Sequence, residues 1–259
     1  MAIPYEDMNI DRSKQPTMQV ATVEASAPLR WLQKGYEDFR AIPLLSMAYG
    51  LLFAGVCALF VIAVSSSPIN TLAFLTGLVL VGPFVAAGLY VASRDLENGN
   101  RPSISRSLRL LISRRTHLGL FALMLSLIMV AWTRMSALIF AIQFNTLTPS
   151  VEAFTSSLTS ADGWIGLAFF AGVGFVLVAA VFTLSVVTVP SVLDRDVDFI
   201  SAMKASYQSV KTNAKAMAIW AGLIALMTGF GIATALVGLV VVFPVLGYAT
   251  WHSYRELVR

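Results

Sequence analysis

Five long blocks of apolar residues, almost free of charge, constrain the fold of this chain more than any other feature. The blocks cover residues 43–64, 69–93, 118–140, 164–187 and 217–251. A helix needs about 20 mostly apolar residues to cross a bilayer, and each block is long enough. Charged residues make up 12% of the chain, whereas soluble domains carry about 25%. The sequence therefore predicts an integral membrane protein built from helices.

The last block is too long for one membrane-spanning helix. Its 35 residues would extend about 52 Å at about 1.5 Å per residue, whereas the hydrocarbon core is about 30 Å thick. Gly229, Phe230 and Gly231 form the expected break, because glycine tolerates the backbone angles of a tight turn. Six spans are therefore expected, at 43–64, 69–93, 118–140, 164–187, 214–228 and 232–251.

The basic residues give this layout an orientation. In the six-span arrangement 17 of the 18 lysines and arginines lie on one side of the membrane, and the exception is Arg134. By the positive-inside rule, the side that carries these basic residues is cytoplasmic. We therefore expect three helical hairpins with both termini in the cytoplasm. Residues 1–30 are polar and are expected to form a flexible cytoplasmic tail, and residues 31–259 form the six-span membrane domain.

Three further segments are typical of short amphipathic helices at the membrane surface, namely 31–42, 103–115 and 198–213. In 103–115 the apolar residues are spaced as one helical face, among four arginines. We expect Arg109, Arg114 and Arg115 to bind the headgroups of anionic phospholipids. The basic residues flank apolar blocks, so lipid is a better partner for them than nucleic acid.

The residues that could support catalysis or hold a cofactor are few. His117 and His252 both lie at expected helix ends, and Cys57 is the only cysteine. No phosphate-binding loop, zinc-protease helix or nucleophile elbow is present in the sequence. We therefore expect no cofactor, no metal site and no enzymatic activity. No acidic residue falls inside an expected span, which argues against ion-coupled transport but leaves a passive pore open.

Arg134 is costly to place, because a charge in the bilayer must be paired or must reach water. It lies toward the outer end of the third span, two residues after Trp132. Its side chain is long enough to reach the outer headgroups. Alternatively it pairs with Glu152, with Asp162 or with an acidic residue of a partner protein, so Arg134 is a candidate interface residue.

A short pattern recurs in the three spans that run toward the cytoplasm. Each has a proline in its cytoplasmic half, followed by an arginine and an acidic residue, and the three pairs are Arg94-Asp95, Arg195-Asp196 and Arg255-Glu256. Pairing would let each carboxylate offset its arginine at the membrane surface. The pattern is compatible with a duplication of one hairpin. It also fits unrelated helices, because membrane helices tolerate proline.

Small residues recur at four-residue intervals in the spans, a spacing that lets helix backbones approach closely. Examples are Gly50 with Ala54, Ala168 with Gly172, Ala221 with Ala225, Ala225 with Gly229 and Gly231 with Ala235. We expect most of these pairs to serve internal packing. An excess could serve docking to another membrane protein.

Five stretches of the chain resemble one uncharacterised family of proteobacterial integral membrane proteins, known as a domain of unknown function. They are WLQKGYEDF at 31–39, SMAYGLLF at 46–53, GPFVAAGLYVASRDLE at 82–97, VPSVLDR at 189–195 and FPVLGYATWHSYREL at 243–257. The resemblance implies a multi-span fold in the bacterial inner membrane, with no catalytic residues to carry over. Members are sometimes labelled cytochrome c oxidase subunit I, but two histidines cannot hold the haems and copper of that subunit.

The function that best fits these observations is a non-catalytic accessory or assembly subunit of a larger inner-membrane complex. The family label makes a terminal oxidase the first host to consider. The alternative is a small membrane transporter or channel, in which Pro83, Pro190 and Pro244 would break helices around a central path. An enzyme acting on lipid has less support, because no cluster of acid, base and nucleophile is present.

Overall fold

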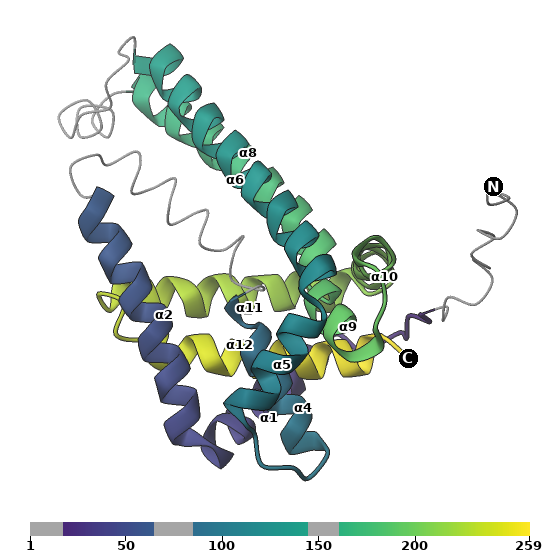
Figure 1. The fold of residues 1–259 in the computed structure, drawn as a ribbon. Coiled ribbons are helices and arrows are strands. Elements are labelled where there is room, and N and C mark those ends of the chain that lie inside the picture. The colour runs from purple at the N-terminus through teal and green to yellow at the C-terminus, as the bar shows by residue number, and fades with distance from the viewer. Residues whose placement is uncertain (1–17, 65–84, 145–160) are drawn as a thin grey trace, which may run out of the picture.

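The computed structural model describes residues 18–64, 85–144 and 161–259, and within these ranges the chain is almost entirely helical (Figure 1). The helices are α1 (Ala27–Ala41), α2 (Pro43–Val64), α4 (Ala87–Glu97), α5 (Ile104–Ser113), α6 (Arg115–Phe144), α8 (Ala161–Ser185), α9 (Thr188–Arg195), α10 (Phe199–Thr212), α11 (Ala214–Ala233) and α12 (Leu239–Leu257). An isolated antiparallel bridge joins Val20 to Val258. The predicted all-α membrane fold is confirmed.

Three described helical segments are long and apolar enough to cross a membrane: Arg115–Ile139, Gly163–Arg195 and Ala214–Ala233. A fourth crossing is counted if α1 and α2, which meet at an angle of 106°, form one bent span. Most of the second predicted span, 69–93, lies outside the described residues, and its last part is α4. The described residues thus account for three to four of the six predicted spans.

Helix α12 lies at the centre of the bundle and packs against α1, α2, α4 and α11. Small residues bring neighbouring backbones close to it. A Cβ atom added to Gly35 would lie 2.6 Å from the carbonyl oxygen of Val245, and one added to Gly50 would overlap the backbone of Val240. The rings of Phe53 and Phe243 stack with centroids 3.8 Å apart. Because of these contacts most of α12 is buried, whereas the other long apolar helices remain largely exposed.

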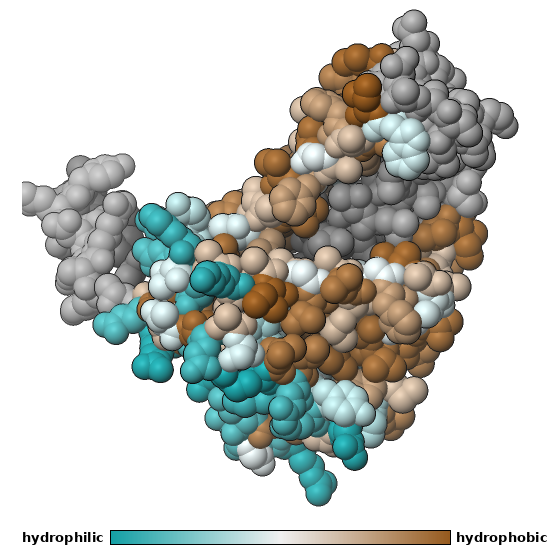
Figure 2. All heavy atoms as spheres, turned by 180° about the vertical axis from the view of Figure 1, so that it is seen from behind, coloured by the Kyte–Doolittle hydropathy of each residue, from teal (hydrophilic) through white to brown (hydrophobic). Residues whose placement is uncertain are grey.

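Helices α6 and α8 run side by side and form a long arm that leaves the rest of the bundle (Figure 1). Within the most apolar 18 residues of each spanning segment, only 17–22% of the residues are buried inside the protein. Figure 2 shows that apolar residues cover most of one face, and that hydrophilic residues gather at one end of it. The large exposed apolar surface is that of a chain whose solvent is lipid.

The turn between α11 and α12 differs from the predicted break. The helix continues through Gly229, Phe230 and Gly231, and the turn lies at 234–238. Gly231 is needed inside the helix, because a Cβ there would collide with Leu239 of the returning helix. Thr234 shapes the turn: its hydroxyl accepts a hydrogen bond from the Gly238 N–H at 2.9 Å and donates one to the Gly231 carbonyl at 3.0 Å. The hairpin itself was predicted correctly, but its turn lies several residues later.

The predicted flexible tail 1–30 is too long at its C-terminal end. Helix α1 begins at Ala27 rather than at residue 31. Residues 19 and 21 hydrogen-bond to the backbone of Arg259 and Leu257, so this part of the segment lies against the end of α12. The amide of Asn213 adds to the attachment, since it accepts from Val23 N–H and donates to Ala21 O.

Candidate functional site

The polar end of the bundle contains an ion-pair network in which α4, α9 and α12 meet. Its centre is Asp194, at the end of α9. One carboxylate oxygen of Asp194 lies 3.2 Å from Arg94 Nε. The other lies 3.4 Å from a guanidinium nitrogen of Arg255 and accepts a hydrogen bond of 2.8 Å from the Tyr254 hydroxyl. A single carboxylate therefore joins three helices.

Three further residues complete what we call the three-helix network, defined by Arg94, Glu97, Asp194, Arg195, Trp251, Tyr254 and Arg255. Arg255 Nε donates to Glu97 at 3.1 Å, and the indole of Trp251 donates to the same carboxylate at 3.1 Å. Arg195 donates to the Tyr254 hydroxyl and to the Val258 carbonyl, both at 2.9 Å. Burial, together with the charge of Asp194, raises the pKa of the Tyr254 hydroxyl, which therefore stays protonated and able to donate.

The three repeated arginine–acid pairs all contribute to this polar end, but their partners lie on other segments. Asp95 pairs with Arg106 at 2.9 Å, and Asp196 pairs with Arg114. Glu256 pairs with Arg30 at 2.7 Å and also accepts from the indole of Trp31 at 2.7 Å. The repeated pattern thus holds distant segments together, and it does not pair neighbours along the chain.

A second, partly buried cluster contains Asp38, Ser93 and His252, from α1, α4 and α12. Asp38 Oδ2 lies 2.9 Å from His252 Nε2 and also accepts a hydrogen bond from Ser93. Ser93 Oγ lies 3.5 Å from the same ring nitrogen. In a serine triad the acid and the serine occupy different ring nitrogens. Here both approach Nε2, so His252 is not placed to take a proton from Ser93 while Asp38 orients the ring.

The structure separates the three arginines predicted to bind lipid. Arg109 and Arg115 are exposed and line one surface pocket, at the junction of α5 and α6. Arg114 is 21% exposed and is engaged by Asp196. Arg134 is exposed on α6, and no described residue forms an ion pair with it. Glu152 lies outside the described residues, as does the side chain of Asp162.

The small-residue pairs divide into two groups. The space beside Gly50 and Gly231 is occupied by residues of α12. In contrast, no described atom lies within 4 Å of a Cβ added to Gly172, Gly222 or Gly229. On α11 the exposed small residues form one continuous line, which we call the α11 small-residue stripe: Ala218, Gly222, Ala225 and Gly229. On α8, Ala168 and Gly172 are also exposed.

Several of these residues were not singled out from the sequence. The repeated arginine–acid pattern was the signal for the network, yet Asp194, its centre, precedes the repeated pair by one position. No local pattern connects Asp38 to His252, which lie 214 positions apart. Among the residues that the structure describes, no three His, Cys, Asp or Glu side chains lie close enough together to hold a metal ion.

Comparison with known proteins adds one finding to this geometry. Residues 71–194 match a family model described as "Predicted integral membrane protein (DUF2189)". The matched region contains α4 to most of α9 and includes Asp194. The comparisons with curated proteins and with solved structures found no match. The resemblance noted in the sequence is thus confirmed: over residues 71–194 this chain matches the DUF2189 family of predicted integral membrane proteins.

Proposed function

We propose that this protein is a non-catalytic accessory or assembly subunit that docks onto another integral membrane protein. The observation that carries the proposal is the α11 small-residue stripe, which is exposed along a membrane-spanning helix. Its members are spaced by four, three and four residues, so they lie on one face. This is the spacing at which two helices pack with a left-handed crossing.

Close approach is what distinguishes such a stripe from an ordinary lipid-facing surface. In a membrane, helix association depends on backbone proximity, because lipid chains are as apolar as leucine side chains. Within this chain, Gly35 and Gly50 use the same device to bring α1 and α2 onto α12. On α11, by contrast, no described helix packs against the glycines of the stripe. A helix of another membrane protein is the partner whose shape fits it.

The three-helix network supports a structural role for the polar end. Its arginines and carboxylates neutralise one another, and Asp194 is only 13% exposed. Groups that are paired in this way are held in position and are not available as free acids, bases or nucleophiles. The label carried by similar proteins makes a terminal oxidase the host to test first. Phospholipids would cover the remaining apolar surface.

We also infer that the protein resides in a bacterial inner membrane with both termini in the cytoplasm. The distribution of basic residues supports this orientation. The turn at 234–238 would then face the periplasm, and α5, α10 and the network would lie on the cytoplasmic side.

Purification of the tagged full-length chain in a mild detergent tests the proposal. We expect a stoichiometric membrane-protein partner in the eluate, with a haem absorption spectrum if the host is an oxidase. The double variant Gly222→Leu/Gly229→Leu should lose the partner, because the added bulk blocks close approach. Leu226→Phe is the matched control, since Leu226 is 74% exposed beside the stripe, and it should retain the partner. Recovery of the wild-type chain alone would contradict the proposal.

The alternative, a small transporter or channel, has one observation in its favour. The helix is interrupted at residues 186–187, between α8 and α9, and Pro190 lies in the first turn of α9. Pro244, however, lies within an unbroken α12 beside the stacked Phe53 and Phe243, and Pro83 lies outside the described residues. Solute flux into liposomes containing the purified chain would favour this alternative over the docking role.

A further inference from the structure

Helix α5 presents an apolar face that the described part of the chain leaves exposed. Ile104, Leu108 and Ile112 follow one another at four-residue intervals and are 67%, 55% and 49% exposed. The adjoining face packs inward, where Ser107 is buried and Leu111 is partly buried against the core. An exposed apolar line on a short helix rich in arginine is typical of a helix that lies in the membrane interface.

Two ion pairs hold α5 in this orientation. Arg106 is bound to Asp95 of α4, and Arg114, directly after α5, is bound to Asp196. Arg114 is also the only residue between α5 and the spanning segment that begins at Arg115. The exposed face of α5 is therefore fixed close to the level at which the chain enters the membrane.

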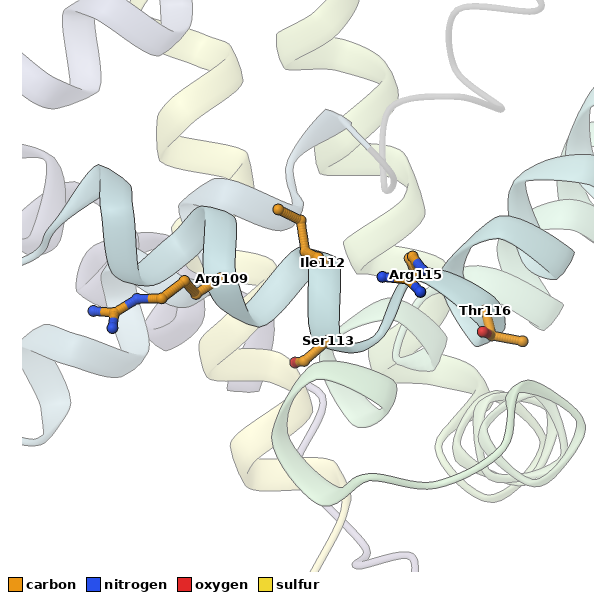
Figure 3. Close-up of a pocket in the computed structure, with 5 residues that line it drawn as sticks. All are labelled: Arg109, Ile112, Ser113, Arg115 and Thr116. Carbon is orange, nitrogen blue, oxygen red and sulfur yellow. The ribbon is translucent and has the colours of Figure 1, made fainter.

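A pocket of about 310 Å³ opens at this junction and is lined by Arg109, Ile112, Ser113, Arg115 and Thr116. Figure 3 shows Arg109 extending to one side of Ile112, with Arg115 and Thr116 on the other. Arg109 Nε donates a hydrogen bond to the Ser105 carbonyl at 3.4 Å. Unlike Arg106 and Arg114, neither lining arginine has a described carboxylate within ion-pair distance.

We propose that this pocket binds an anionic glycerophospholipid of the adjacent leaflet. Arg109 and Arg115 supply positive charge and N–H donors for the headgroup phosphate. The acyl chains lie along Ile112 and Leu108. A lipid fits better than a soluble anion, because the charged pocket adjoins the exposed apolar residues of α5. A phospholipid can place its phosphate in the pocket and its acyl chains against these apolar residues.

The test compares lipid binding of two charge-matched variants. The full-length chain is placed in nanodiscs of phosphatidylglycerol with excess phosphatidylcholine, and the lipids retained after transfer to detergent are counted by native mass spectrometry. We expect the wild type to retain phosphatidylglycerol selectively. Arg109→Gln/Arg115→Gln should lower this retention by about tenfold. The control Lys34→Gln/Arg40→Gln removes the same charge from two exposed positions on α1 and should retain the lipid.

Three outcomes would overturn the proposal. The first is unchanged phosphatidylglycerol retention in the Arg109/Arg115 variant. The second is an equal loss in the α1 control, which would indicate a general effect of net charge. The third is a wild-type dimer that dissociates on Leu108→Ser substitution, which would show that a second copy covers the apolar face. Because the readout is bound lipid, loss of a protein partner does not affect it.

Discussion

Arg255 Nε lies 3.1 Å from a carboxylate oxygen of Glu97, which joins the end of α12 to the end of α4 across 158 positions of sequence. Both residues belong to the polar segments that follow apolar helices. Burial lowers the pKa of Arg255, but the charge and hydrogen bond of Glu97 together with the charge of Asp194 outweigh it, so the pKa is raised above its ordinary value. The chain thus uses charged groups as connections between helix ends.

Asp194→Asn should destabilise the protein by about 2–3 kcal/mol, because it leaves Arg94 and Arg255 without their shared carboxylate. The Asp194 side chain is 13% exposed, so water compensates only a small part of the loss. Thermal unfolding in detergent measures the change. Glu24→Gln is the matched control: Glu24 also pairs with an arginine but is 80% exposed, and a change of under about 0.5 kcal/mol is expected. Equal effects at both positions would contradict a central role for Asp194.

Two glycines of α2 should respond in opposite directions to the same substitution. Gly50→Ala should lower stability by about 1–3 kcal/mol, because the new methyl group overlaps the backbone of Val240 and forces α2 away from α12. Gly55→Ala meets no described atom within 4 Å and should be neutral or stabilising by up to about 1 kcal/mol. Unfolding temperatures in one detergent give the comparison. A tolerated Gly50→Ala would show that the α2–α12 contact is looser than described.

The N-cap of α10 should give a defined pH dependence. Burial raises the pKa of Asp198, but hydrogen bonds from Ser201 and Ile200 outweigh it and lower the pKa. A lowered pKa means that the contribution is present above the unfolded value of about 3.9 and is lost as pH falls through the folded value. Asp198→Ala should cost about 1 kcal/mol at pH 7, and Asp198→Asn much less. The difference between wild type and Asp198→Ala should shrink below about pH 4 in thermal unfolding scans.

Arg134→Gln should leave the stability nearly unchanged, within about 0.5 kcal/mol. Arg134 is exposed on α6, and no described residue pairs with it, so we expect its charge to reach headgroups or water already. Thermal unfolding in detergent measures the effect. A loss of several kcal/mol would instead indicate an enclosed pair with an acidic residue of the same chain. Normal folding with loss of a co-purifying protein would place Arg134 at a subunit interface.

Cysteine labelling tests the orientation at two described positions. In a Cys57→Ala background, Val237→Cys should react with a membrane-impermeant reagent in intact cells, because Val237 is 71% exposed in the turn between α11 and α12. Lys211→Cys, at an exposed position of α10, should react only after the membrane is permeabilised. Labelling of Lys211→Cys from outside would reverse the proposed topology.

The spans were predictable because length and hydropathy decide them locally. The segments beginning at Arg115 and Gly163 and the helix Ala214–Ala233 lie close to the predicted positions. The turn after α11 was misplaced because Gly231 was interpreted as a source of backbone freedom. Its role is to admit Leu239, and that contact exists only in the folded hairpin.

The candidate sites were predictable only in part. The arginine-rich character of α5 is visible in the sequence, but which arginines remain free depends on Asp95 and Asp196. Likewise the spacing of small residues is a sequence feature, whereas the division into filled and exposed positions follows from how α12 is surrounded. Partners separated by many positions carry no local signal.

The central place of α12 has a consequence for biosynthesis. Among the described helices it is the last to be translated, so α1, α2 and α4 are synthesised before the helix that covers them exists. During that interval Gly35 and Gly50 lack their close contacts with α12, and Glu97 and Asp194 lack Arg255. A nascent chain that ends before residue 239 therefore leaves the surfaces of α1, α2 and α4 that contact α12 uncovered.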